Sequence, residues 1–243
     1  MNIWTYWEGP KPDYIDLCLR SVQQGCGSYA DVHIVTPDTL GDYIKPGTIH
    51  KNYEGVKDIA IRADCIRAAL LAEHGGWWWD ADTIVLGDRF PTVDRMVRHF
   101  PGESPLFAVW DQPPLRVLNG YIYMPPGCDE ATEWLDRVNF RLKVARECPI
   151  EWAELGEAIL TPLLVKSKTA WRVERNVFLP VDIDRHVTAF FDDLNPLDWV
   201  RDGTVCFGLN HSYFMYHQEE AMRRPWERGT LIHRLFRHAE AEL

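Results

Sequence analysis

The chain has 243 residues, of which 46% are apolar and 26% are charged. This supplies enough apolar sequence for a hydrophobic core and too little charge for a disordered chain. The formal net charge is −10, whereas proteins that bind mainly to nucleic-acid phosphates carry basic surfaces. Nucleic acid is therefore disfavoured as the principal partner. The six cysteines are scattered and form no C-x-x-C pair, which disfavours a structural zinc site.

The predicted elements alternate strands and helices from the N-terminus. Apolar runs predict strands at residues 3–7 and 32–35 with a helix at 13–22 between them, which is typical of a βαβ unit. Further strands are expected at 77–79, 83–86, 106–109 and 121–124, and further helices at 56–74, 130–146 and 154–166. Prolines and aspartates break the pattern over 169–206. We expect one α/β domain with a mixed, mainly parallel sheet flanked by helices.

Asp80-Ala81-Asp82 follows an apolar strand, so two carboxylates are expected at a strand end, where open α/β sheets bind ligands. Carboxylate oxygens bind Mg²⁺ or Mn²⁺, and such an ion neutralises a diphosphate leaving group. An acidic turn with no ligand is the alternative, and the tripeptide alone favours that alternative.

Asp64 and Arg67 lie three residues apart on the helix predicted before that turn. Both lie off the apolar stripe of Ile59, Ile66 and Leu70, so neither needs to be buried. A surface ion pair worth ~0.3 kcal/mol and a polar pair at a ligand site are equally compatible with this spacing. The three tryptophans that precede the turn, residues 77–79, are expected to lie mainly in the core.

Three segments together resemble the core motif of the DXD sugar-transferase superfamily: residues 62–71, His74-Gly75-Gly76 and the Asp80–Asp82 turn. That superfamily contains capsular polysaccharide synthesis proteins, Och-type mannosyltransferases and the glucosylating clostridial toxins. The opening segment, residues 3–9, resembles its first strand. The resemblance covers residues 1–90 and implies a GT-A-like fold, with a donor half at 1–110 and an acceptor half at 111–243.

The resemblance also implies an enzyme that uses a nucleotide-diphosphate sugar, a UDP- or GDP-sugar, with Mn²⁺ or Mg²⁺ and retention of configuration. By position, Trp7 would stack on the base, with Tyr6 beside it in the donor site. Asp64 and Arg67 would hold the hydroxyls of the donor sugar as catalytic residues.

The same resemblance implies the metal ligands and a third catalytic residue. Asp80 would face the ribose or the sugar and bind the metal through water, and Asp82 would bind it directly. Asn119 matches a small polar residue near the reacting centre. His211 matches a C-terminal metal ligand, although a lone histidine is as often a hydrogen-bonded surface residue. The segment 155–162 resembles a Gly-Pro-x-x-Leu-Thr motif but has Glu157 in place of the proline, so it receives no catalytic role.

The acceptor is not identified by the sequence. A saccharide or lipid-linked saccharide is favoured over a protein, and a modified nucleic acid is disfavoured by the charge. One rival is a metal-dependent phosphohydrolase or nucleotidyltransferase, but no further acidic cluster for a two-metal site is evident. Another is a carbohydrate-binding protein, which would not need Asp64, Arg67 and the carboxylate pair together.

The sequence also predicts a cytoplasmic protein. The N-terminus resembles no signal peptide, and no apolar stretch approaches the ~18 residues of a membrane helix. Peripheral membrane contact is the alternative, because residues 223–238 carry five arginines against one glutamate with Leu231, Ile232, Leu235 and Phe236 at helical spacing. A C-terminal helix docked on the domain is the simpler interpretation.

Overall fold

The computed structural model describes residues 1–87, 104–110, 113–145, 149–181, 189–190, 198–199, 203–210 and 230–241. The chain divides into two compact units, each made of stretches that are not contiguous in sequence. Unit 1 comprises Met1–Gly9, His33–Trp79 and Val97–Glu174, and unit 2 comprises Pro10–Val32, Asp80–Met96 and Arg175–Leu243. The units are therefore interleaved in sequence and do not follow the expected functional halves, which meet at residue 110.

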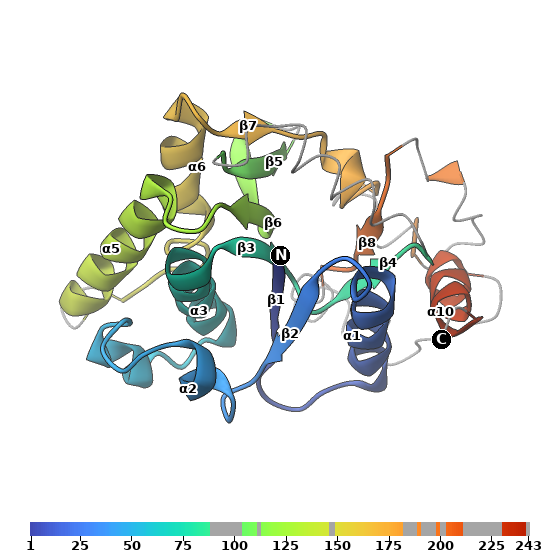
Figure 1. Cartoon of the computed structure of the whole chain (residues 1–243), viewed down its shortest axis with the longest axis horizontal. Helices are drawn as coiled ribbons and strands as arrows, with labels where there is room; N and C mark the ends of the chain where they lie inside the picture. The colour runs from blue at the N-terminus through green and yellow to red at the C-terminus, as the bar shows by residue number, and fades with distance from the viewer. Residues whose placement is uncertain are drawn as a thin grey trace. The chain divides into compact units, whose positions relative to one another are not determined.

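Unit 1 is built on a six-stranded sheet with the order β2-β1-β3-β6-β5-β7 (Figure 1). Its strands are β1 (Asn2–Tyr6), β2 (Asp31–Val35), β3 (Gly76–Trp79), β5 (Leu106–Trp110), β6 (Arg116–Met124) and β7 (Trp171–Arg172). The β1–β3 and β5–β7 pairs are parallel, whereas β6 is antiparallel to both β3 and β5. The sheet is therefore mixed.

Three helices pack with this sheet: α3 (Ile59–His74), α5 (Asp129–Val144) and α6 (Glu157–Lys166). Helix α3 contacts β1, β3 and β6, α6 contacts β6, and α5 lies against both helices (Figure 1). A single hydrophobic cluster joins the helices to the sheet through residues such as Trp78, Ile122 and Trp134. Two short helices, α2 (Leu40–Tyr43) and η1 (Lys51–Gly55), connect β2 to α3. The expected α/β fold, a mixed sheet flanked by helices, is confirmed.

Several element boundaries differ from the predicted ones, and three of them concern elements near the predicted site residues. Helix α3 begins three residues later than expected, because the Asp58 carboxylate accepts hydrogen bonds from the backbone N–H groups of Ala60 (2.8 Å) and Ile61 (3.2 Å) and caps the helix there. Helix α6 begins at Glu157 because residues 152–156 form a turn. Strand β6 begins at Arg116, and Asn119 therefore lies within a strand.

Burial on α3 does not follow the predicted stripe. Every residue from Asp64 to Leu71 is buried, whereas Ile59, which was expected to face the core, is 48% exposed. The expectation that Asp64 and Arg67 stay out of the core is therefore wrong. The three tryptophans of β3 are at most 1% exposed, which confirms their assignment to the core.

Unit 2 contains α1 (Asp13–Cys26), the antiparallel pair β4 (Thr83–Val85) and β8 (Cys206–Gly208), the short helix η3 (Arg175–Val177) and α10 (Leu231–Ala241). Helix α1 packs closely on β4, since the Ser21 hydroxyl accepts a hydrogen bond from the Val85 N–H at 3.1 Å. The approach of the two elements also needs Gly25, because an added Cβ there would lie 2.5 Å from the Val85 side chain.

Helix α10 packs on α1 and β4 (Figure 1). Its four apolar side chains, Leu231, Ile232, Leu235 and Phe236, are at most 2% exposed. The docked C-terminal helix is thus the arrangement observed, and the apolar face needed for membrane contact is covered. Of the basic residues that suggested such contact, Arg223, Arg224 and Arg228 lie outside the described residues. Within the described part of the chain, no helix is long and apolar enough to cross a membrane.

Candidate functional site

Asp64 and Arg67 form a buried ion pair on α3. The Arg67 Nη1 atom donates to Asp64 Oδ1 at 2.6 Å, and the two residues are only 5% and 6% exposed. The guanidinium carbon of Arg67 also lies 4.6 Å from the centre of the Trp78 ring, a cation–π geometry that suits arginine in a low-dielectric environment. The spacing left open a surface ion pair, and this possibility is excluded because both side chains are buried. Two charges buried this deeply depend on each other, since the loss of one leaves the other without compensation.

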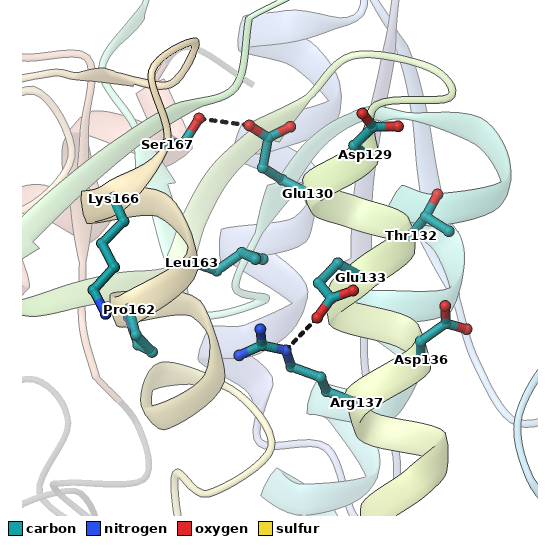
Figure 2. Close-up of a pocket in the computed structure, with 10 residues that line it drawn as sticks. All are labelled: Asp129, Glu130, Thr132, Glu133, Asp136, Arg137, Pro162, Leu163, Lys166 and Ser167. Atoms are coloured by element: carbon teal, nitrogen blue, oxygen red, sulfur yellow. Dashed lines mark hydrogen bonds and ion pairs between the residues drawn. The ribbon is translucent and has the colours of Figure 1, made fainter.

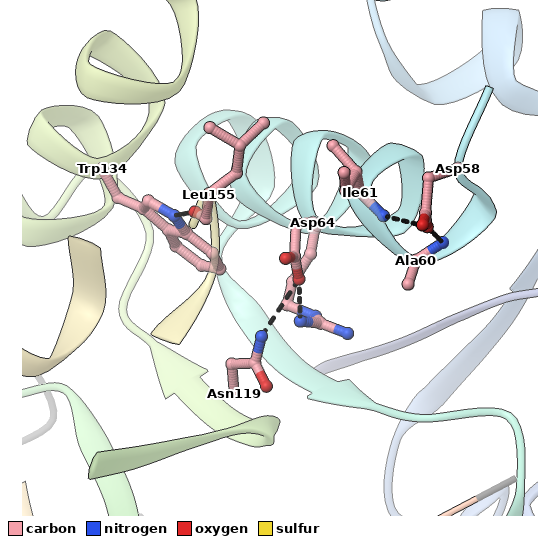
Figure 3. A network of polar contacts seen from close by, with 8 residues as sticks. Asp58, Ala60, Ile61, Asp64, Asn119, Trp134 and Leu155 are labelled. Carbon is pink, nitrogen blue, oxygen red and sulfur yellow. Dashed lines mark hydrogen bonds and ion pairs between the residues drawn. The ribbon is translucent and has the colours of Figure 1, made fainter. Parts of the chain in front are cut away.

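Asn119 joins this pair from the neighbouring strand β6. Its Nδ2 atom donates to the same oxygen, Asp64 Oδ1, at 3.0 Å (Figure 3). The structure therefore brings together the three predicted catalytic residues, Asp64, Arg67 and Asn119, which we call the Asp64 centre.

A second polar network lies at the end of β1 in the same unit. The Tyr6 hydroxyl donates to Glu8 Oε2 at 2.7 Å, and Arg62 Nε donates to the same oxygen at 3.0 Å. The Arg62 guanidinium lies 4.7 Å from the centre of the Tyr53 ring. Burial, helped by the bond to Glu8, raises the pKa of the Tyr6 phenol far above its ordinary value. The Tyr6 phenol is thus neutral, and its hydroxyl group is hydrogen-bonded to Glu8.

Trp7 follows Tyr6 and is half-buried. Its backbone N–H donates to the Val35 carbonyl at 3.1 Å, which fixes the residue beside β2. Trp7 therefore has a held backbone and a ring that is partly open to solvent.

The sequence interpretation missed the other members of these networks. Glu8, Arg62 and Tyr53 were not proposed as site residues, although Arg62 precedes Asp64 by two positions on the same helix. The sequence assigned Trp78 to the core but did not predict its contact with Arg67. No spacing rule pairs these residues, because three separate segments supply them.

The Asp80–Asp82 turn belongs to unit 2. Asp82 is 8% exposed and Asp80 is half-buried. The turn is held by backbone contacts, since the Thr83 hydroxyl donates to the Asp80 carbonyl at 2.5 Å and the Leu209 N–H donates to the Asp82 carbonyl at 3.0 Å.

The Asp82 charge also acts on two residues of α1. Burial raises the pKa of the Tyr14 phenol and of the Cys18 thiol, and the negative charge of Asp82 raises both further. The Asp82 carboxylate thus lies close enough to Tyr14 and Cys18 for its charge to affect both groups.

The donor set fits a hard divalent cation in part. Mg²⁺ and Mn²⁺ accept one or two carboxylates, with water and substrate phosphate as the other ligands. Among the described residues, no group of three or more His, Cys, Asp or Glu side chains is placed to hold a metal. His211, the third predicted ligand, lies outside the described residues.

An open groove of about 650 Å³ lies elsewhere in unit 1, between α5 and α6 (Figure 2). Acidic side chains of α5, from Asp129 to Asp136, line one side, and Pro162 to Lys166 of α6 line the other. None of the predicted site residues lines it. The groove is therefore not the candidate site.

Comparison with known proteins supports the class that these motifs predicted. Residues 1–104 match the family described as capsular polysaccharide synthesis protein, one of the groups that the sequence resembles. No curated protein matches the chain in sequence. The matched segment contains Tyr6, Trp7, the Asp64–Arg67 pair and the Asp80–Asp82 turn. The match covers less than half of the chain and supports a glycosyltransferase-like activity.

Two solved structures are distantly similar. One, described as the PaToxG glycosyltransferase, is 16% identical, with a TM-score of 0.48 and coverage of 68% of each chain. The other, a glycosyltransferase involved in the glycosylation of the major capsid of PBCV-1, is 12% identical. It has a TM-score of 0.47 and coverage of 89% of this chain and 100% of the other. These likenesses are too distant to assign residue roles.

Proposed function

We propose that the chain transfers a sugar from a nucleotide-diphosphate sugar to an acceptor in a metal-dependent reaction. The observation that carries this proposal is the Asp64 centre, in which two donors from different elements converge on one buried carboxylate oxygen. Sugars, which present several hydroxyl groups, are ligands that such a set recognises.

The roles within unit 1 follow from the contacts of each residue. The Asp64 carboxylate would accept hydrogen bonds from hydroxyl groups of the donor sugar, while Arg67 and Asn119 hold that carboxylate in one orientation. Trp7, with its partly open ring, would stack on the nucleotide base. Tyr6 would support this end of β1 through Glu8 and would not contact the base through its hydroxyl group.

In unit 2, we propose that Asp82 binds Mn²⁺ or Mg²⁺ directly and that Asp80 binds it through water. A bound ion would neutralise the diphosphate and stabilise it as a leaving group. His211 is proposed as a further ligand. Two features support this role: it follows Leu209, which is bonded to Asp82, by two residues in the chain, and imidazole suits Mn²⁺ better than Mg²⁺.

We further propose that the reaction retains the anomeric configuration. The departing diphosphate oxygen would take the proton of the attacking acceptor hydroxyl on the same face of the sugar, so no protein nucleophile is required. The acceptor is proposed to be a saccharide or a lipid-linked saccharide, in keeping with the matched family.

Hydrolysis of donors tests the proposal without a known acceptor. The protein is incubated with UDP- and GDP-sugars, with and without Mn²⁺, and release of free sugar is measured. We expect slow, Mn²⁺-dependent release from one donor and loss of this release in Asp64→Asn. Asp42→Asn, at an exposed position of α2, is the matched control. Release of phosphate rather than sugar would indicate a phosphohydrolase instead.

A further inference from the structure

Gly156, at the start of α6, lies directly against the Asp64 centre. A Cβ atom added to Gly156 would lie 2.2 Å from Asn119 Nδ2 and 2.7 and 2.8 Å from the two Asp64 carboxylate oxygens. Separations below 3.0 Å essentially never occur for a real Cβ atom. Asp64 and Asn119 can therefore keep their observed positions only because residue 156 has no side chain.

The neighbours of Gly156 distinguish it from glycines that serve packing alone. An added Cβ at Gly75 would meet Pro126, and one at Gly76 would meet mainly the backbone of Asn2. At Gly156 the three nearest atoms all belong to the polar ends of Asp64 and Asn119. The contact is thus made with the groups that the proposed chemistry uses.

Helix α5 holds the chain immediately before Gly156. The buried Trp134 Nε1 atom donates to the Leu155 carbonyl at 2.7 Å (Figure 3). Arg141 forms an ion pair with Glu154 and donates to its Oε2 atom at 3.2 Å. Two consecutive residues are therefore tied to α5, and the turn cannot easily retreat to accommodate a larger residue at position 156.

Helix α6 holds the chain on the other side. The Gly156 carbonyl accepts the backbone N–H of Leu160 at 3.0 Å, and the Thr161 hydroxyl accepts the backbone N–H of Val117 at 3.0 Å. Val117 precedes Asn119 on the same strand. The segment that contains Gly156 and the strand that contains Asn119 are therefore fixed to each other close to the Asp64 centre.

We infer that Gly156 is a positioning residue for the donor sugar. This inference rests on the proposed function, because Gly156 acts only through Asp64 and Asn119. With no side chain, Gly156 lets the start of α6 close on the Asp64 carboxylate and fixes one orientation of that carboxylate and of the Asn119 amide. Any side chain would turn one of them away and disturb contacts to the sugar, while the base and diphosphate keep theirs. This assigns a role to the segment that the sequence comparison left without one.

The test compares Gly156→Ala with Gly55→Ala. Gly55 lies in the same unit, has no positive φ angle and has nothing within 4 Å of an added Cβ. We expect Gly156→Ala to slow Mn²⁺-dependent donor hydrolysis by at least about tenfold, because misplacement of reacting groups by 1 Å can cost more than this. Its Kd for UDP or GDP, measured by calorimetry, should change by less than about threefold. Gly55→Ala should leave both quantities unchanged.

A second measurement tests the steric cause independently of activity. Asn119→Ala removes the atom closest to the added methyl group, so the double variant should recover part of the Tm that Gly156→Ala loses. Additive losses of Tm would overturn the inference, as would equal losses of nucleotide binding and hydrolysis in Gly156→Ala. If the wild-type protein neither binds nor hydrolyses any donor, both the proposed function and the sugar-positioning role are overturned. The Tm comparison would still decide whether Asn119 prevents a larger residue at position 156.

Discussion

The Asp64 centre and the Asp80–Asp82 turn use carboxylates in different ways. In the Asp64 centre, a helix and a strand supply the residues, and side-chain hydrogen bonds at 2.6 and 3.0 Å orient the carboxylate. In the turn, the backbone carbonyls of Asp80 and Asp82 accept hydrogen bonds from the Thr83 hydroxyl and the Leu209 N–H. Side-chain hydrogen bonds thus orient the carboxylate in the first region, and hydrogen bonds to backbone carbonyls hold the main chain in the second.

This difference matches the ligands that we propose. Sugar hydroxyls differ between epimers only in direction, so a residue that distinguishes them must have a fixed orientation. A metal ion orients its own ligands and needs carboxylates that can adjust to it. We therefore expect substitutions in the Asp64 centre to change both stability and sugar binding, and substitutions in the turn to change activity alone.

The largest effect is expected for Asp82→Asn. Loss of a directly bound carboxylate should reduce Mn²⁺-dependent hydrolysis by at least about a hundredfold, since the charge stabilisation that a metal supplies is worth several kcal/mol. The backbone bond from Leu209 is kept, and a buried charge near Tyr14 is removed, so the Tm should stay nearly unchanged. Asp31→Asn, at the exposed first position of β2, is the control. Activity within about threefold of wild type would refute the metal assignment.

Asp64→Ala should reduce stability as well as activity. It leaves the Arg67 guanidinium buried without the carboxylate that it contacts, which costs about 3–5 kcal/mol for a buried pair, compared with ~0.3 kcal/mol for a surface pair. Urea unfolding measures this loss. The double variant with Arg67→Ala should lose less than the two single variants together, because the two charges depend on each other.

The same variants separate sugar binding from nucleotide binding. Below its unfolding transition, Asp64→Ala should bind UDP or GDP almost as wild type does but bind the corresponding nucleotide sugar more weakly. Calorimetry with both ligands gives this comparison directly. Equal losses for the nucleotide and the nucleotide sugar would contradict the placement of Asp64 and Arg67 at the sugar.

A smaller effect is expected for Trp7→Ala, which should weaken nucleotide binding by about 1–3 kcal/mol through loss of a stacked base. Trp7→Phe should restore part of it, because an aromatic face is kept. Trp171→Ala, at a 45% exposed position in the same unit, is the control. If Trp7→Ala instead unfolds the protein while the remaining folded fraction binds normally, Trp7 is a structural residue.

The sequence predicted the elements around the site better than the burial of the site residues. Periodicity located α3, and apolar runs located β1, β3 and β4, because these patterns are local. Periodicity did not predict the burial of Asp64 and Arg67. Helix α3 is covered on several sides, so no apolar stripe distinguishes a buried face from an exposed one. The cap at Asp58 was present in the sequence as an aspartate before the first apolar residue and would have set the start of α3.

The remaining features depend on contacts between distant segments. Glu8 meets Arg62 across 54 positions, and Asn119 meets Asp64 across 55. Local sequence patterns contain no signal for such pairs, and only the resemblance placed Asn119 near the same centre as Asp64. The role inferred for Gly156 has the same origin, because the atoms that exclude a side chain there come from two other elements.

The smallest effect concerns Glu130 of α5, which lines the groove and takes no part in the Asp64 centre. Its carboxylate accepts hydrogen bonds from the hydroxyl groups of Ser167 (2.6 Å) and Thr169 (2.8 Å). Partial burial acts to raise the pKa of Glu130, but these two bonds outweigh it and hold the pKa below its ordinary value. A carboxyl group whose pKa is lower in the folded state stabilises the fold above its unfolded pKa and loses that contribution as the pH falls through the folded value.

Glu130→Gln should therefore destabilise the protein by about 0.5–1 kcal/mol at pH 7, a small amount because solvent screens the partly exposed carboxylate. As the pH falls through the lowered pKa of Glu130, wild type and variant should come to unfold at similar urea concentrations, because the wild-type carboxyl becomes protonated too. Donor hydrolysis at pH 7 should be unchanged, in contrast to every substitution in the Asp64 centre. A difference in stability that stays constant as the pH falls through that pKa would show that the amide disturbs packing and that the charge of Glu130 contributes nothing.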